Sequence, residues 1–175
     1  MKNLPLLLFL FTGTMMLFFI MRWHGKPLAQ LPETKSGIVS LEFAKTKQRA
    51  DEIVNNWNKN GLQQHASTNT SLDYLFIFFY GLFLFTANWL ISLRQKNLYK
   101  TISQVIALFG LTAALFDVNE NFFLFKMLAF SCTDAEINST WWLAAGKFLL
   151  AAIAVLWILI NLLYFIIAKP KTLTS

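Results

Sequence analysis

The chain is poor in charged residues and almost without cysteine. Only 14% of its 175 residues are charged, against about 25% in typical soluble domains. The single cysteine, Cys132, excludes an intramolecular disulfide, a CxxC redox pair and a zinc site built from several thiolates. No Walker loop, GxSxG elbow or HExxH motif occurs, so the enzyme classes that depend on those motifs are excluded as well.

Long apolar runs dominate what is present. Hydrophobic residues make up 56% of the chain, and the mean hydropathy is +0.50. A helix needs about 20 apolar residues to cross about 30 Å of hydrocarbon. Four runs meet this length, at residues 4–21, 72–91, 102–127 and 142–167. We therefore expect a single all-α membrane domain over residues 1–175, folded as an up-and-down four-helix bundle, with the first run retained as an anchor.

The distribution of basic residues predicts the orientation. Lys and Arg accumulate on the cytoplasmic side of membrane helices, and this explains the net charge of +6 without a nucleic-acid partner. Residues 131–140 contain no Lys or Arg. Basic residues instead flank the first and fourth runs and lie between the second and third, at Lys2, Arg94, Lys96, Lys100, Lys169 and Lys171. Both termini should therefore lie in the cytoplasm, with residues 22–71 outside.

The outer segment contains one helix signal, over residues 38–57. Apolar residues recur there at helical spacing, at Val39, Phe43, Ala50, Ile53, Val54 and Trp57. Such an amphipathic helix should lie on the outer membrane face or across the mouth of the bundle. It would act as a lid or partner surface, or simply as a packed connector.

Asp117, Glu120 and Lys147 are ionisable residues inside the apolar runs, and Asp73 lies at the mouth of the second run. A charged residue near the centre of a membrane helix costs about 2.5–3.5 kcal/mol on insertion scales, so it usually faces the protein interior or a cavity. Asp117, Glu120 and Asn121 are spaced i, i+3, i+4 and share one helix face. Lys147 of the fourth run should reach a similar depth, which suggests a pair with Asp117 or Glu120. The alternative is that Lys147 extends alone to the outer interface.

These residues define a candidate polar site in the outer half of the bundle. Its members are Glu42, Asp73, Tyr80, Asp117, Glu120, Asn121 and Lys147. Three interpretations remain open. The cluster is a hydrogen-bonded network that fixes helix register, a divalent-cation site built from Asp73, Asp117 and Glu120, or a proton-titrating site.

The first function hypothesis is a binding or accessory protein in the lipid bilayer, with an outward-facing pocket for an ion or a lipid headgroup. The second is an intramembrane enzyme acting on a lipid-like substrate, with Glu120 or Asp117 as general acid–base and Asn121 as its orienting partner. The third is a proton- or ion-coupled transporter. Because four helices are few for a monomeric transporter, the third hypothesis requires a homo-oligomer.

Several short patterns also carry a family resemblance. They are Ser40-Leu41-Glu42-Phe43-Ala44, Leu72-Asp73-Tyr74-x-Phe76, Tyr80-Gly81 and Asp117-x-x-Glu120-Asn121, with a lysine in the last span. Together they resemble a family of small bacterial four-helix membrane proteins. The resemblance implies a bacterial plasma (inner) membrane and singles out the same polar residues, but it brings no activity.

Overall fold

The computed structural model describes residues 3–167. In this range the chain is all-helical, and four helices are long and apolar enough to cross a membrane: α1 (Leu4–His24), α4 (Gln63–Ser92), α5 (Asn97–Leu128) and α6 (Asp134–Ile167). They indicate a membrane protein. Lys2, Lys169 and Lys171, which contribute to the orientation prediction, lie outside the described residues.

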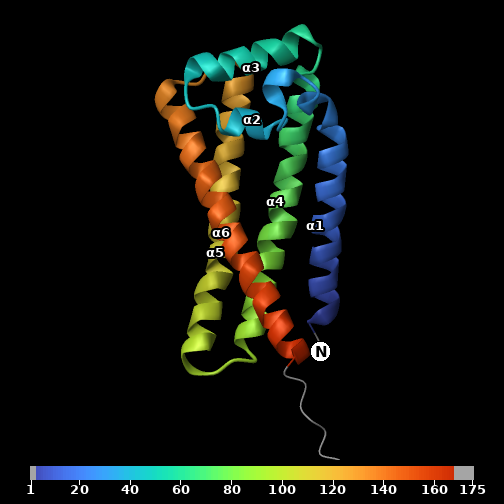
Figure 1. Ribbon diagram of the computed structural model, residues 1–175, viewed down its shortest axis with the longest axis vertical. Coiled ribbons are helices and arrows are strands. Elements are labelled where there is room, and N and C mark those ends of the chain that lie inside the picture. Colours follow the sequence, from blue (N-terminus) through green and yellow to red (C-terminus); the bar gives the residue numbers. More distant parts are fainter. Residues whose placement is uncertain (1–2, 168–175) are drawn as a thin grey trace, which may run out of the picture.

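The four long helices lie side by side, and shorter elements cover one end of them (Figure 1). These elements are two 3₁₀ turns, η1 (Lys26–Ala29) and η2 (Pro32–Thr34), and two helices, α2 (Val39–Glu42) and α3 (Lys47–Lys59). Helix α5 packs against both α4 and α6. Within the described range, α1 packs extensively on α4 but not on α5 or α6, so one side of the molecule is left open between α1 and α6.

Helices α4 and α6 begin earlier than the apolar runs predict, at Gln63 and Asp134. The start of α6 has a local cause in a capping box. The Glu136 carboxylate accepts a hydrogen bond from the Thr133 backbone N–H at 2.8 Å, and Thr133 Oγ1 accepts one from the Glu136 N–H at 3.3 Å. Lys126 forms an ion pair with Glu136. Most of the segment between the third and fourth apolar runs, residues 131–140, is therefore helical.

The single helix predicted over residues 38–57 is wrong. The structure has the short α2 and the longer α3, separated by residues 43–46. Thr46 caps α3 by accepting a hydrogen bond from the Arg49 N–H at 3.3 Å, as serine and threonine do at helix starts. The Lys47 N–H donates to Asp134 Oδ1 at 2.8 Å. This contact ties the start of α3 to the start of α6, which a continuous helix would not allow.

Helix α3 covers the end of α4, α5 and α6 through a compact hydrophobic cluster. Its residues Ile53, Val54 and Trp57 are buried against Leu124 and Met127 near the end of α5. Burying side chains of this size stabilises the fold by about 1.5–3 kcal/mol each. The covering segment is therefore a packed part of the protein, and it holds α2 directly above the interior.

Glycine lets α4 and α5 approach closely. A Cβ added at Gly110 would lie 2.7 Å from the Leu84 Cβ and 3.1 Å from the Phe85 backbone nitrogen. One added at Gly81 would lie 2.7 Å from the Ala114 Cβ. Small residues at such crossings are typical of membrane helix pairs. The close crossing places the next turn of α4 against the acidic face of α5.

Candidate functional site

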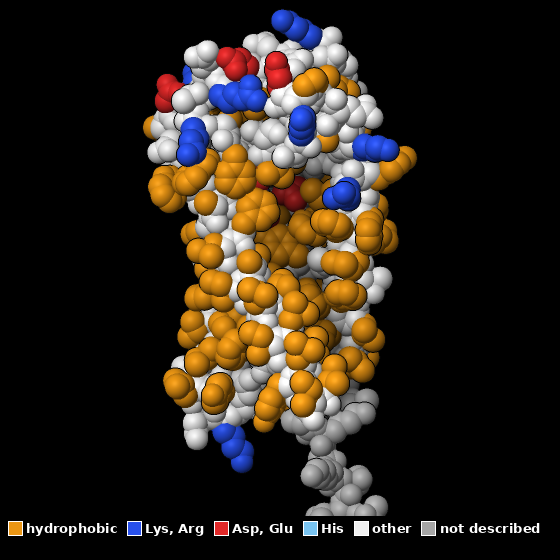
Figure 2. All heavy atoms as spheres, in the orientation of Figure 1, with side chains coloured by type: hydrophobic (Ala, Val, Ile, Leu, Met, Phe, Trp, Pro, Cys, Tyr) orange, Lys and Arg blue, Asp and Glu red, His pale blue; other side chains and the backbone are white. Residues whose placement is uncertain are grey.

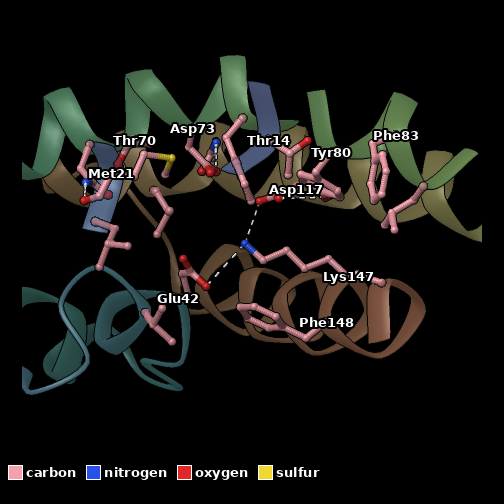
Figure 3. Close-up of a pocket in the computed structure, with 18 of the residues that line it drawn as sticks. Thr14, Met21, Glu42, Thr70, Asp73, Tyr80, Phe83, Asp117, Lys147 and Phe148 are labelled. Carbon is pink, nitrogen blue, oxygen red and sulfur yellow. Dashed lines mark hydrogen bonds and ion pairs between the residues drawn. The ribbon is translucent and has the colours of Figure 1, made fainter. Parts of the chain in front are cut away.

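Lys147 is the centre of a buried ionic cluster that joins three elements. Its Nζ lies 2.7 Å from Asp117 Oδ1 on α5 and 3.5 Å from Glu42 Oε2 on α2 (Figure 3). The same Nζ lies 2.8 Å from Glu120 Oε2, also on α5. Only 5% of the Lys147 surface is exposed. The predicted pairing of Lys147 is therefore present with both α5 acids, and Lys147 does not extend alone to the interface.

Two further hydrogen bonds connect α4 to this cluster. The Tyr80 hydroxyl donates to Asp117 Oδ2 at 3.0 Å, and Asn121 Nδ2 donates to Asp73 Oδ2 at 2.7 Å. Asp117 is thus held by Tyr80 on one oxygen and by the ammonium of Lys147 on the other. The structure brings together all seven predicted site residues, including Glu42 from the covering segment.

The cluster contains more acid than base. Three carboxylates surround one ammonium, so full ionisation leaves a formal charge of two negatives. Within residues 3–167, Glu42 Oε2 and both Glu120 carboxylate oxygens accept no hydrogen bond. Unsatisfied buried charge is costly. Burial accordingly raises the pKa of the Glu42 carboxyl, and the neighbouring Lys147 offsets this only in part.

A cavity of about 380 Å³ lies beside the cluster. Glu42, Asp73, Asp117 and Lys147 line its charged end. The remaining wall is mostly apolar and includes Met15, Phe76, Phe83, Leu84, Phe148 and Val155. A hollow is visible below the covering segment, with acidic side chains inside it and apolar side chains around it (Figure 2). The cavity thus combines a long apolar wall with one charged end.

The cavity wall also includes a helix to which the sequence assigned no site residue. Thr14, Met15 and Met21 of α1 line it, opposite Phe148 and Val155 of α6. Thr14 is buried, and its hydroxyl donates to the Leu10 carbonyl at 2.8 Å. This bond within the helix uses the hydroxyl proton, so Thr14 offers the cavity no free hydrogen-bond donor.

The geometry does not favour the divalent-cation interpretation. Among residues 3–167, no group of three or more His, Cys, Asp or Glu side chains is placed to hold a metal ion. The Lys147 ammonium occupies the position between Asp117 and Glu120 that a cation would need. Asp73 instead accepts a hydrogen bond from Asn121. Asp117 and Glu120 are therefore paired with the ammonium, and Asp73 is paired with an amide donor.

The other end of the helices is closed by polar contacts. Gln95 Nε2 donates to Asn161 Oδ1 at 2.6 Å, and Trp157 Nε1 donates to Ser103 Oγ at 2.7 Å. Asn88 Nδ2 also reaches the Ala154 carbonyl at 3.4 Å. These contacts tie α4, α5 and α6 together, so the cavity is flanked by a packed, hydrogen-bonded layer on that side.

Comparison with known proteins gives no further information about the site. No family matches the chain, and neither the curated proteins nor the solved structures contain a significant match. The functional argument therefore depends on the geometry of the cavity and of the Lys147 cluster.

Proposed function

We propose that the protein binds a membrane amphiphile, with the apolar chain in the cavity between α1 and α6 and the polar end at the Lys147 cluster. The observation that carries the proposal is the cavity itself, whose apolar wall ends at Glu42, Asp73 and Asp117. Its volume of about 380 Å³ falls within the usual 300–1,000 Å³ range of ligand pockets.

The route of entry follows from helix packing. Because α1 and α6 do not pack extensively on each other in the described range, the cavity is reached from the side of the molecule that would face lipid. A ligand that partitions into the bilayer meets this opening directly. A water-soluble ligand would have to pass the segment covering the outer end.

The membrane placement that fits this function is the one predicted from the basic residues. An up-and-down bundle in a bacterial plasma membrane would have both termini in the cytoplasm and α2 and α3 at the outer face. Arg94, Lys96 and Lys100 would lie on the cytoplasmic side. The buried face of α3 supports its role as an amphipathic cap over the bundle. The cavity would then open to the outer leaflet.

Binding is better supported than transport or catalysis. A transporter needs a path toward the cytoplasm, and the contacts of Gln95, Ser103 and Asn161 fill that end instead. A general acid–base needs a carboxyl free to exchange protons with a substrate. Here Asp117 is engaged by both Tyr80 and Lys147, which suits a fixed binding surface.

The test is to fill the cavity and count bound lipid. Ala151 lines the cavity, whereas the adjacent Ala152 is exposed on the same helix. We expect Ala151→Phe to lower the phospholipid retained per protein, measured by native mass spectrometry after extraction in mild detergent, and Ala152→Phe to leave it unchanged. Val155→Trp, at a more exposed cavity position, is a second variant if Ala151→Phe does not fold. Equal retention by wild type and all folded variants would contradict the proposal.

A further inference from the structure

The acidic end of the cavity has fewer hydrogen-bond donors than its carboxylate oxygens can accept. Glu42 is 5% exposed and lines the cavity, yet within residues 3–167 its Oε2 accepts no hydrogen bond and has only the 3.5 Å ion pair with Lys147. Asp73 also lines the cavity and accepts one hydrogen bond from Asn121. The Lys147 ammonium already forms shorter ion pairs with Asp117 and Glu120. A positively charged ligand with N–H donors would donate hydrogen bonds to the Glu42 and Asp73 carboxylates and offset their negative charge.

A second cavity with the opposite charge adjoins the first. It has a volume of about 720 Å³ and contains Arg22, Lys26 and Lys35 in its lining. All three basic side chains are exposed, and no ion pair to any of them occurs in the part of the chain that the structure describes. The two cavities share four lining residues: Met21, Ile38, Asn69 and Phe76. An acidic and a basic pocket are thus contiguous at the covered end of the helices.

We infer that the bound amphiphile is a phospholipid whose headgroup ends in a protonated primary amine. The amine binds at Glu42 and Asp73, and the phosphate binds at Arg22, Lys26 and Lys35. This inference rests on the proposed function, and it specifies the ligand class. Opposite charges separated by a short linker match the two adjoining pockets, and the apolar chains lie between α1 and α6.

The hydrogen-bonding chemistry favours an amine over other cationic groups. A primary ammonium has three N–H donors, and charge-assisted hydrogen bonds to carboxylates are about twice as strong as neutral ones. A quaternary ammonium carries the same charge without any donor. A glycerol headgroup donates through hydroxyls and does not offset the negative charge. Discrimination between these headgroups should therefore depend on Glu42 and Asp73.

The experiment compares headgroups on the purified full-length chain. Phosphatidylethanolamine, phosphatidylcholine and phosphatidylglycerol with identical acyl chains are supplied in equimolar mixture, and the bound species are counted by native mass spectrometry. We expect phosphatidylethanolamine to exceed phosphatidylglycerol about tenfold, the ratio for about 1.4 kcal/mol, and to exceed phosphatidylcholine as well. Glu42→Gln and Asp73→Asn should each lower the first ratio several-fold. Glu52→Gln, an exposed acid on α3, is the matched control and should keep it.

A combined Arg22→Gln, Lys26→Gln and Lys35→Gln variant tests the phosphate contacts. It should weaken binding of all three phospholipids to a similar degree. Equal binding of the three headgroups by wild type, or an unchanged ratio in folded Glu42→Gln and Asp73→Asn, would overturn the inference and leave the proposed function standing. Failure of the wild-type protein to retain any phospholipid would overturn both. If neither acid variant folds, the wild-type headgroup ratio decides alone.

Discussion

Lys147 Nζ and Asp117 Oδ1 are 2.7 Å apart, and both side chains are buried where α5 faces α6. Within residues 3–167, Lys147 is the only basic residue that pairs with Asp117, so Asp117 depends on it for compensation of its charge. Removing one partner of a buried ion pair typically costs about 3–5 kcal/mol because the other charge is left uncompensated. The pair therefore links helix packing to the chemistry of the site.

Lys147→Met should strongly destabilise the protein. The variant keeps a side chain of similar length but leaves Asp117, Glu120 and Glu42 without their shared cation. We expect a loss of about 3–5 kcal/mol in the free energy of unfolding, measured by thermal or denaturant unfolding in detergent micelles.

Lys126→Met provides the control for that substitution. Lys126 pairs with Glu136, but both side chains are partly exposed, and exposed pairs contribute about 0–1 kcal/mol. Adding Asp117→Asn and Glu120→Gln to Lys147→Met should restore part of the lost stability, since the uncompensated acids are then neutral. Equal free energies of unfolding for Lys147→Met and Lys126→Met would show that the buried cluster does not stabilise the fold.

Tyr80→Phe should weaken the link between α4 and α5. The substitution removes the hydroxyl that donates to Asp117 Oδ2 at 3.0 Å and leaves a buried acceptor without that partner. We expect a loss of about 1–3 kcal/mol in unfolding free energy. Tyr74→Phe is the matched change on the same helix, because Tyr74 is 38% exposed and stacks on Phe125 through its ring. An effect of Tyr74→Phe as large as that of Tyr80→Phe would contradict the assigned role.

Gly110→Ala should disrupt the closest approach of α4 and α5. The added methyl would meet the Leu84 Cβ at 2.7 Å and the Phe85 backbone nitrogen at 3.1 Å, and backbone cannot move aside as a side-chain end can. We expect about 1–3 kcal/mol of destabilisation from overpacking, measured in the same unfolding assay. Gly146→Ala meets only the Phe116 ring at 2.8 Å, which can rotate, so its cost should be smaller. A larger destabilisation by Gly146→Ala than by Gly110→Ala would show that α4 and α5 can move apart at this crossing at little cost.

Cysteine labelling tests the orientation in the membrane. In a Cys132→Ala background, Lys59→Cys at the end of α3 and Lys96→Cys before α5 place single thiols at opposite ends of the long helices. We expect a membrane-impermeant maleimide to label Lys59→Cys on intact bacterial spheroplasts, and Lys96→Cys only after permeabilisation. The opposite pattern would invert the topology and place the cavity in the inner leaflet.

The sequence was sufficient to identify the four apolar helices and to select the residues of the Lys147 cluster. Asp117, Glu120 and Lys147 stand out because charge within an apolar run is costly unless it is paired. The early start of α6 was missed, although Thr133 and Glu136 have the spacing of a capping box. These features depend on neighbouring residues in the chain, so a sequence pattern can reveal them.

Other features depend on contacts between distant segments. The break between α2 and α3 accompanies the bond from the Lys47 N–H to Asp134, a residue far along the chain. The face of α1 that lines the cavity was not predictable either, because that helix is apolar on all sides and only its packing on α4 selects Thr14 and Met21. A polar pocket was expected, but its long apolar wall was missed for the same reason: no single segment contains it.

Helix α1 forms one wall of the cavity but packs extensively only on α4 within residues 3–167. The ion pairs of Lys147 with Asp117 and Glu120 belong to α5 and α6. A sideways displacement of α1 would therefore change the width of the opening between α1 and α6 without separating those charges. A bound amphiphile can then exchange rapidly with the surrounding bilayer while the buried ion pairs of Lys147 stay intact.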